Sequence, residues 1–427
     1  MRLASILAAG IAVVAGPVFA KTDIQFWHAM GGRLGEVVEE IATKYNASQD
    51  TYNLVPTYKG GYEDTMTAGI AAFRAKQQPN IIQIFDAGAA TIINAKGATI
   101  PVADLMEGFD SSDYIEGVRN FYADSDGNMI GMPFNSSTPL LYYNKDVLAK
   151  AGIDAPPATW EEFEAMAPKI KEAGYQALAQ SHSPWIFSEN FHSRHNLQLA
   201  TGNNGYDTTD VEILYNNDAM KMHWGKVKEW LDAGYYGFYG RGWGDNQDAF
   251  VQQKTAMWLG SSGSFGGLAK SAEFEFGAAE LPYWKSITDE PYGTFIGGAA
   301  LFAMAGKPDE ENAGVADFMA FLTSPEMQYF WHKETGYVPI TNAAYELAKS
   351  DGYYESTPDA EVGITQLTQR GGEWTKGYRL GFYVQIREAM YKQYDNIFSG
   401  STSIEDAFAA MEKESNALLE RFHASMN

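Results

Sequence analysis

Three short apolar segments near the N-terminus decide the fold. They read DIQFW at residues 23–27, YNLVPTY at 52–58 and IIQIF at 81–85, and Asp86 follows the third. Each has the length and the β-branched or aromatic content of a strand. Helical patterns separate the three segments. Strands that alternate with helices predict a mostly parallel sheet with helices on both faces.

The helical patterns rest on the spacing of apolar residues. The first pattern places five of them on one helical face, at Leu34, Val37, Val38, Ile41 and Tyr45. The second runs over residues 63–76, and we expect three apolar side chains to face inward there, Met66, Ile70 and Phe73.

Helix-start signals continue to the C-terminus. Thr159 is followed three residues later by Glu162, which is a capping box. Pro325 follows Ser324 and suits a first helical turn. Ser403 predicts the start of a C-terminal helix. Residues 140–143 are strand-like, so a second α/β unit is expected to start near Gly131.

The chain length predicts two domains. Its 427 residues exceed what one hydrophobic core usually organises. No long Pro- or Ser-rich linker is present in the sequence, so we expect two lobes joined by several short crossings. The predicted N-terminal lobe comprises 21–135 and 290–344, and the predicted C-terminal lobe comprises 136–289 and 345–427.

The first twenty residues resemble a secretory leader. Met1-Arg2 gives a positive start, an apolar run follows to Val18, and Val18-Phe19-Ala20 fits a signal peptidase site. We therefore predict a signal peptide over residues 1–20 and a mature chain that begins at Lys21 in the periplasm. No Cys follows the run, which argues against a lipid anchor.

Charge and cysteine content exclude several classes of function. The net charge of −23 disfavours nucleic acids and anionic membranes as partners. The absence of Cys from the sequence removes disulfides, thiol nucleophiles and thiolate metal sites. A large exported chain without disulfides fits a bacterial periplasm better than a eukaryotic secretory route.

Searches for catalytic and metal motifs mostly fail. The sequence has no H-E-x-x-H, no P-loop, no G-x-S-x-G and no complete G-x-G-x-x-G motif. His192 and His195 have helical spacing, but Glu189 is only a candidate third ligand, so no metal and no cofactor are expected. The aromatic, Gly-rich stretch 234–244 is interpreted as a loop beside a cleft rather than a phosphate cradle.

Small polar, glycine and aromatic residues gather where strands are predicted to end. These places are Gly60-Gly61-Tyr62, Asp86, residues 135–139, residues 260–264, Ile296-Gly297-Gly298 and Thr335-Gly336-Tyr337. Open α/β sheets bind ligands beyond the carboxyl ends of their strands. Hydroxyls, backbone N–H groups and one Arg suit a small phosphorylated polyol, although each turn alone is weak evidence.

Several of these segments resemble a known family. Ala155-Pro-Pro-Ala-Thr-Trp160, Thr323-Ser-Pro-Glu-Met327 and Thr335-Gly-Tyr-Val-Pro339 resemble the solute-binding proteins of bacterial ABC importers. Phe26-Trp-His28, Ala68–Arg74, Phe134–Pro139, Leu141–Asp146 and Gln385-Ile-Arg387 resemble more specifically the Ugp-type branch, whose periplasmic members bind sn-glycerol 3-phosphate. The resemblance implies the type II two-lobed fold, closing by hinge motion on its ligand.

The resemblance also implies roles for individual residues. Tyr62 would pack on the glycerol carbons and donate its hydroxyl, and Asp86, a Glu in the family, would accept from glycerol hydroxyls. Ser137, Ser261, the Gly298 N–H and Tyr337 would face the phosphate. Arg387 would grip the phosphate with its planar fork. All of these except Tyr337 also have a purely structural alternative. The alternatives are a half-buried loop position for Tyr62, a helix N-cap for Asp86, turn or cap roles for Ser137 and Ser261, a close-packing site for Gly298 and a surface ion pair on a helix for Arg387.

One departure from the family concerns specificity. The family's stacking Trp falls at His182, with Trp185 three residues away. Losing that Trp would widen the site, and a glycerophosphodiester such as glycerophosphocholine then becomes a candidate ligand, its quaternary ammonium held by aromatic faces.

The resemblance thus implies a non-enzymatic, monomeric binding protein that delivers its ligand to an inner-membrane permease with a cytoplasmic ATPase. Two alternatives stay open at this stage. An oligosaccharide binder of the same fold would use aromatic platforms and need no Arg. An exported hydrolase of glycans or phosphodiesters would need an acid/base pair or a metal, for which no motif stands out.

Overall fold

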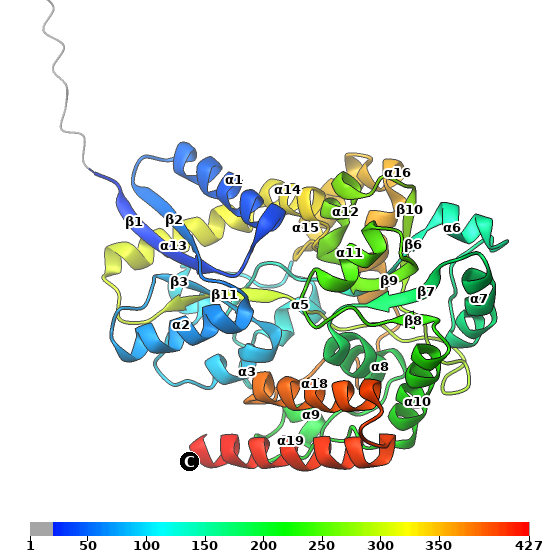
Figure 1. Ribbon diagram of the computed structural model, residues 1–427. Coiled ribbons are helices and arrows are strands. Elements are labelled where there is room, and N and C mark those ends of the chain that lie inside the picture. The colour runs from blue at the N-terminus through cyan, green and yellow to red at the C-terminus, as the bar shows by residue number, and fades with distance from the viewer. Residues whose placement is uncertain (1–19, 427) are drawn as a thin grey trace, which may run out of the picture.

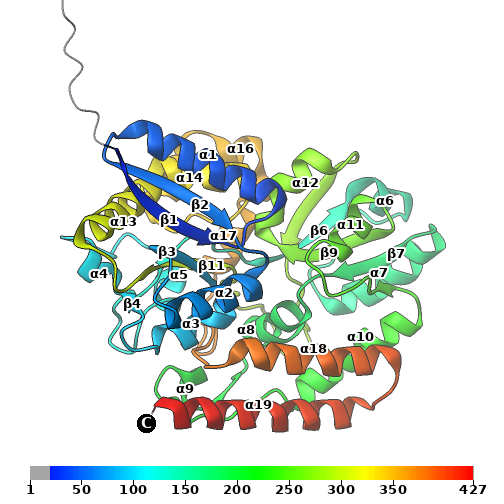
Figure 2. The ribbon, with the colours of Figure 1, turned by 60° about the vertical axis from the view of Figure 1, so that its left-hand side comes forward.

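The computed structural model of the protein describes residues 20–426. The predicted leader therefore lies outside the described residues except for Ala20. The described chain forms two α/β lobes side by side, each built on one sheet (Figures 1 and 2). The expected two-lobed α/β fold is confirmed.

The strands and helices alternate along most of the chain. The strands are β1 (Thr22–His28), β2 (Tyr52–Tyr58), β3 (Ile81–Phe85), β4 (Thr99–Ile100), β5 (Met132–Pro133), β6 (Pro139–Asn144), β7 (Gln176–Gln180), β8 (Tyr236–Gly237), β9 (Thr255–Ser261), β10 (Phe276–Glu280) and β11 (Ala299–Met304). The helices up to the middle of the chain are α1 (Gly32–Ser48), α2 (Tyr62–Arg74), α3 (Asp86–Ile93), α4 (Val102–Leu105), α5 (Glu116–Phe121), α6 (Lys145–Lys150), α7 (Trp160–Glu172), the π-helical η1 (Pro184–Glu189), α8 (Asn190–Arg194), α9 (Thr201–Gly205) and α10 (Asp218–Asp232). The later helices are α11 (Asp245–Val251), the short 3₁₀ turns η2 (Ser262–Ser264) and η3 (Pro358–Ala360), α12 (Phe265–Ser271), α13 (Asp309–Leu322), α14 (Pro325–Thr335), α15 (Asn342–Ser350), α16 (Tyr353–Ser356), α17 (Val362–Thr368), α18 (Tyr383–Ser399) and α19 (Ile404–Met426).

The first sheet has the strand order β2-β1-β3-β11-β4, and β5 also pairs with β11. The three strands of the opening βαβαβ run are parallel, as expected from their helical connections. β11, which arrives from much later in the chain, runs antiparallel to β3, β4 and β5.

The second sheet has the order β10-β6-β9-β7-β8. β7 is parallel to β8 and β9, whereas β6 is antiparallel to β9 and β10. Both sheets are therefore mixed rather than mostly parallel, because β11 and β6 each enter their sheet directly from the other lobe. The strands of the first sheet lie within 22–133 and 299–304, and those of the second within 139–280. The exact lobe boundaries stay a prediction.

One predicted helix face is wrong. Ile70 and Phe73 on α2 are exposed, at 43% and 36%, and Met66 is only partly buried. The helix instead buries Thr65 and Gly69, and a Cβ on Gly69 would collide with the side chain of Ile82. The small residues let α2 approach β3 closely, so the larger apolar residues turn outward.

The predicted helix starts are confirmed. Thr159 caps α7, and Glu162 completes the capping box. Ser324 accepts a hydrogen bond from the N–H of Met327 at the start of α14, and the hydroxyl of Ser403 accepts from the N–H of Asp406 beside α19.

The last two helices connect the lobes. α18 and α19 lie antiparallel beneath both lobes (Figures 1 and 2). α18 contacts α3 of the first lobe as well as η1 and α10 of the second. A side chain on α18 can therefore reach residues of both lobes. Within residues 20–426, none of the helices combines the length and the apolar character needed to cross a bilayer.

Candidate functional site

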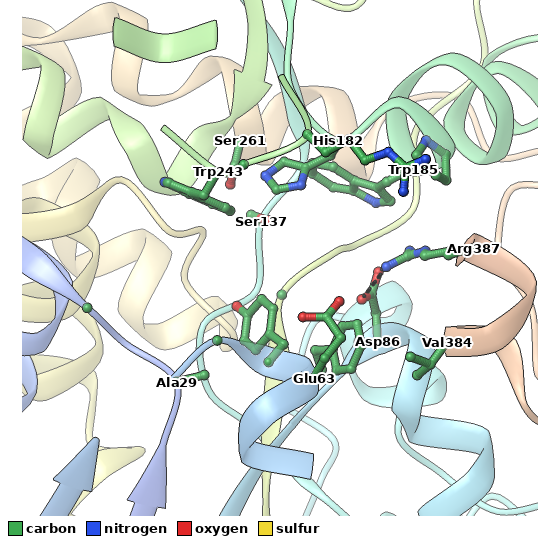
Figure 3. A pocket seen from close by; sticks show the side chains of 18 of the residues that line it. Ala29, Glu63, Asp86, Ser137, His182, Trp185, Trp243, Ser261, Val384 and Arg387 are labelled. Carbon is green, nitrogen blue, oxygen red and sulfur yellow. Dashed lines mark hydrogen bonds and ion pairs between the residues drawn. The ribbon is translucent and has the colours of Figure 1, made fainter. Parts of the chain in front are cut away.

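A cavity of about 560 Å³ lies between the two sheets. Its wall includes all nine residues that the sequence suggested for the site: Tyr62, Asp86, Ser137, His182, Trp185, Ser261, Gly298, Tyr337 and Arg387 (Figure 3). Their role in ligand binding stays a prediction, but the fold brings all of them to one place.

The strand ends explain this convergence. Tyr58 ends β2, Asp86 follows β3 directly, and Ser261 ends β9. His182 lies two residues after β7. The carboxyl ends of strands from both sheets thus point at the same space, which is where open α/β sheets place their ligands.

Arg387 is held between two buried carboxylates. Its Nη1 and Nη2 donate to Asp86 at 3.1 and 2.7 Å, while its Nε and Nη2 donate to Glu189 at 2.8 and 2.7 Å. The Asp86 and Glu189 side chains are 5% and 0% exposed, and that of Arg387 is 14% exposed. Asp86 comes from the first lobe and Glu189 from η1 beside the second sheet.

These contacts leave Arg387 little capacity for a ligand. A guanidinium has five N–H donors, and the two carboxylates take four of them. One N–H on Nη1 is left for other partners. One guanidinium faces two carboxylates at this corner, which gives a formal net charge of −1. The corner therefore suits hydroxyl groups better than a phosphate dianion.

Burial and charge act in opposite directions on this cluster. Burial raises the pKa of Glu189, and the nearby Arg387 opposes that rise. Burial lowers the pKa of Arg387, but Asp86 and Glu189 together raise it well above its ordinary value. Arg387 is therefore permanently charged. Asp86 also accepts from the N–H of Ala87 at 2.9 Å, so it serves the start of α3 as well as the ion pair.

The neutral donors lie on another part of the wall. Within the described chain, the Ser137 Oγ has no hydrogen-bond partner, although the Ser137 backbone is fixed by two hydrogen bonds with Gly297. The Ser261 Oγ accepts from the N–H of Gly263 at 3.1 Å, which leaves its own proton free. Gly298 has a φ of +97°, and a Cβ there would overlap the carbonyl oxygen of Asn135. The wall at this point requires glycine.

Two tyrosines add further donors. The Tyr62 ring stacks on Phe85 with centroids 5.1 Å apart, and its hydroxyl accepts from the amide of Asn135 at 2.7 Å. Tyr337 stacks on Trp331 and is buried. Burial raises the pKa of Tyr337 to about 12 and that of Tyr62 well above its usual value. Both hydroxyls therefore keep their protons at neutral pH.

An aromatic wall faces these groups. The rings of His182 and Trp243 have centroids 4.6 Å apart, and Trp185 lies 6.4 Å from His182 (Figure 3). Burial, together with the charge of Arg387, lowers the pKa of His182 to about 4, so the imidazole is neutral at pH 7. Trp243 comes from the loop 234–244, which the sequence placed beside a cleft.

The sequence missed several residues of this region. Glu189 was considered only as a metal ligand, yet it holds Arg387. Glu63 and Glu388 line the cavity without any local motif that announces them. Arg241 forms ion pairs with Asp395 and, at 3.7 Å, with Glu388. These charges become neighbours only through folding, so a linear pattern could not identify them.

The two histidines considered for a metal are structural. His192 Nδ1 lies 2.7 Å from the carbonyl oxygen of Ser188, and its Nε2 lies 3.1 Å from the amide nitrogen of Asn217. The His195 Nε2 accepts from the N–H of Trp284 at 2.8 Å. Across residues 20–426, no three His, Asp or Glu side chains gather in a way that could hold a metal ion.

Comparison with known proteins gives the family. The bacterial extracellular solute-binding protein family matches residues 40–361. The sn-glycerol-3-phosphate-binding periplasmic protein UgpB of Escherichia coli K12 is 39% identical over 99% of this chain and 98% of its own. UgpB of Shigella dysenteriae is 38% identical over the same shares.

Solved structures support the same fold. UgpB from Mycobacterium tuberculosis in complex with glycerophosphocholine matches with a TM-score of 0.80, at 22% identity, over 94% of this chain and 99% of its own. Maltose-bound MalE3 of Thermotoga maritima (T. maritima) matches with a TM-score of 0.78, at 18% identity, over 94% and 100%. At these identities the likeness shows only the fold. The chain belongs to the bacterial extracellular solute-binding proteins.

Proposed function

We propose that this protein is the periplasmic binding component of an ABC importer, and that it binds sn-glycerol 3-phosphate or a glycerophosphodiester such as glycerophosphocholine. The single observation that carries the proposal is the cavity, which unites residues of both lobes at all nine positions that the family resemblance suggested. The 39% identity to a protein named for binding sn-glycerol 3-phosphate supports the ligand class.

The contacts suggest how such a ligand would lie. Its phosphate would accept from Ser137, Ser261, the Gly298 N–H and Tyr337, which are neutral donors without a competing carboxylate among their hydrogen bonds. Its glycerol hydroxyls would lie against Asp86 and the free Nη1 proton of Arg387. Arg387 then acts chiefly by fixing Asp86, because most of its N–H groups are already used.

The protein would release its ligand unchanged. Closure of the lobes around the ligand would exclude water and strengthen each polar contact. The closed form would dock as a monomer on the permease, which works with a cytoplasmic ATPase. No step of this cycle breaks a bond, in agreement with relatives that are named for binding rather than for catalysis.

Calorimetric titration of ligand-stripped mature protein, residues 21–427, tests the proposal. We expect glycerol 3-phosphate, glycerophosphocholine or both to bind. Ser137→Ala should weaken that binding by roughly tenfold or more, because a hydrogen bond to a charged group is lost. Ser271→Ala, on the exposed end of α12, is the matched control and should change nothing.

The alternatives predict other results. Binding of maltose but of neither phosphate compound would overturn the proposed ligand and favour an oligosaccharide binder, which the aromatic wall of His182, Trp185 and Trp243 would also suit. Turnover of a chromogenic phosphodiester by the purified protein would instead revive a hydrolase.

A further inference from the structure

The charged residues that line the cavity are not equally paired. Five lining residues have acidic or basic side chains: Glu63, Asp86, Arg241, Arg387 and Glu388. Asp86 is bonded to Arg387, and Glu388 lies 3.7 Å from Arg241. Glu63 alone among the five forms no ion pair and no side-chain hydrogen bond within residues 20–426. An unpaired carboxylate on a cavity wall is the feature that the proposed function leaves unused.

The Glu63 carboxylate lies inside the cavity, opposite the aromatic wall. Glu63 lies in the first turn of α2, and its carboxylate extends into the cavity (Figure 3). The aromatic wall of His182, Trp185 and Trp243 lies on the opposite side of the same space (Figure 3). Both cations on the lining are already engaged, Arg241 by Glu388 and Asp395, and Arg387 by Asp86 and Glu189.

A carboxylate opposite aromatic faces is a suitable environment for an organic cation. The ring faces attract an ammonium group through their quadrupoles, and the carboxylate supplies the opposite charge. His182 does not compete with such a cation, because burial lowers its pKa to about 4 and the ring stays neutral.

We infer that Glu63 and the aromatic wall select ligands with a cationic head group, which makes Glu63 the residue that separates ammonium-bearing glycerophosphodiesters from glycerol 3-phosphate. This inference rests on the proposed function. A phosphomonoester carries close to two negative charges at neutral pH and meets an unpaired carboxylate. A diester of an amino alcohol carries one negative charge on phosphorus and one positive charge that Glu63 can neutralise.

Three ligands separate head-group charge from phosphate charge. Glycerophosphocholine has a cationic head group, glycerophosphoglycerol is a diester with a neutral one, and glycerol 3-phosphate has none. Each is titrated calorimetrically into ligand-stripped wild type, Glu63→Gln, Trp243→Leu and Glu39→Gln. Glu39 is exposed on α1 outside the cavity lining, so its variant matches the change in net charge.

We expect Glu63→Gln to weaken the binding of glycerophosphocholine about tenfold. In the same variant the affinity for glycerophosphoglycerol should stay within about twofold of the wild-type value, and the affinity for glycerol 3-phosphate should be unchanged or higher. Trp243→Leu should also weaken only the choline diester, and Glu39→Gln should change none of the three. Glu63 is exposed, so its variant should keep the wild-type unfolding midpoint.

Other outcomes overturn the inference. Equal weakening of all three ligands in Glu63→Gln would assign Glu63 a general role in the shape of the site. Unchanged glycerophosphocholine affinity would remove any role in selection. If the wild type binds none of the three ligands, the proposed function itself fails, and the inference falls with it. If wild type binds glycerol 3-phosphate but not the choline diester, only the inference fails.

Discussion

At the scale of single residues, Arg387 is the most constrained side chain of the site. It forms ion pairs with two buried carboxylates from opposite lobes. Removing its positive charge would leave the negative charges of Asp86 and Glu189 without a counter-charge. We predict that Arg387→Met lowers the free energy of unfolding by about 3–5 kcal/mol at pH 7. Urea unfolding of ligand-free protein measures this loss.

The pH dependence of that loss distinguishes charge from packing. Without Arg387 the buried Glu189 holds its proton more readily than in the unfolded chain, so the stability difference between the variant and wild type should shrink as the pH falls toward about 5. Arg241→Met removes an Arg whose ion pairs are exposed and should cost less than about 1 kcal/mol. Equal losses in both variants, or a loss independent of pH, would contradict the interpretation.

At the scale of elements, the turn that leads into β11 is built around Gly298. Its φ of +97° and the overlap of any Cβ with Asn135 make the position intolerant of side chains. We predict that Gly298→Ala destabilises the protein by about 2 kcal/mol or more, measured by thermal or urea unfolding. It should also weaken ligand binding, because the same turn carries the Gly298 N–H and touches the backbone of Asp86.

Gly267→Ala is a suitable control for that substitution. Gly267 lies inside α12, and a Cβ there would meet nothing within 4 Å. Because alanine favours helix over glycine, this variant should be neutral or more stable by up to about 1 kcal/mol. A Gly298→Ala protein as stable as Gly267→Ala would show that the turn adapts.

Elements were predicted well where the signal is local. The capping box at Thr159 and the Ser-Pro start of α14 are complete within a few residues, so the sequence was sufficient to predict them. The inward face of α2 depends on how closely Gly69 approaches Ile82, which no spacing rule encodes. The nine site residues were proposed through family resemblance. Glu189 was assigned no ligand-site role, because its partner Arg387 lies 198 residues away in the chain.

At the scale of the whole molecule, the histidines make stability depend on pH. Six of the seven are buried or half-buried with lowered pKa values. Burial lowers the pKa to about 4 for His28, His182, His192 and His332 and to about 3 for His195, and it also lowers the pKa of His223 well below its ordinary value. In the unfolded chain the same groups titrate near their ordinary pKa of about 6.5.

The sign of the effect follows from proton binding. Between about pH 6.5 and pH 4 these histidines bind protons in the unfolded chain but stay neutral in the folded protein, so acid favours unfolding. Glu189, whose pKa burial raises, acts in the opposite direction but is a single group. We predict that the free energy of unfolding falls by at least about 3 kcal/mol from pH 7 to pH 5. Urea titrations at several pH values give the slope, and a flat or rising profile toward acid would contradict the prediction.

The path of the chain through β11 also determines the order in which the molecule can be assembled. β3 is complete at residue 85, but its neighbour in the sheet begins only at residue 299, after the chain has built the second sheet. During synthesis, one edge of β3 therefore stays unpaired until β11 has been made, and an unpaired strand edge can pair with other chains and cause aggregation. A gene fragment cut between the lobes would leave the first sheet without one of its inner strands. The first lobe is therefore not a contiguous module, and its sheet can be completed only after the residues of the second sheet have been made.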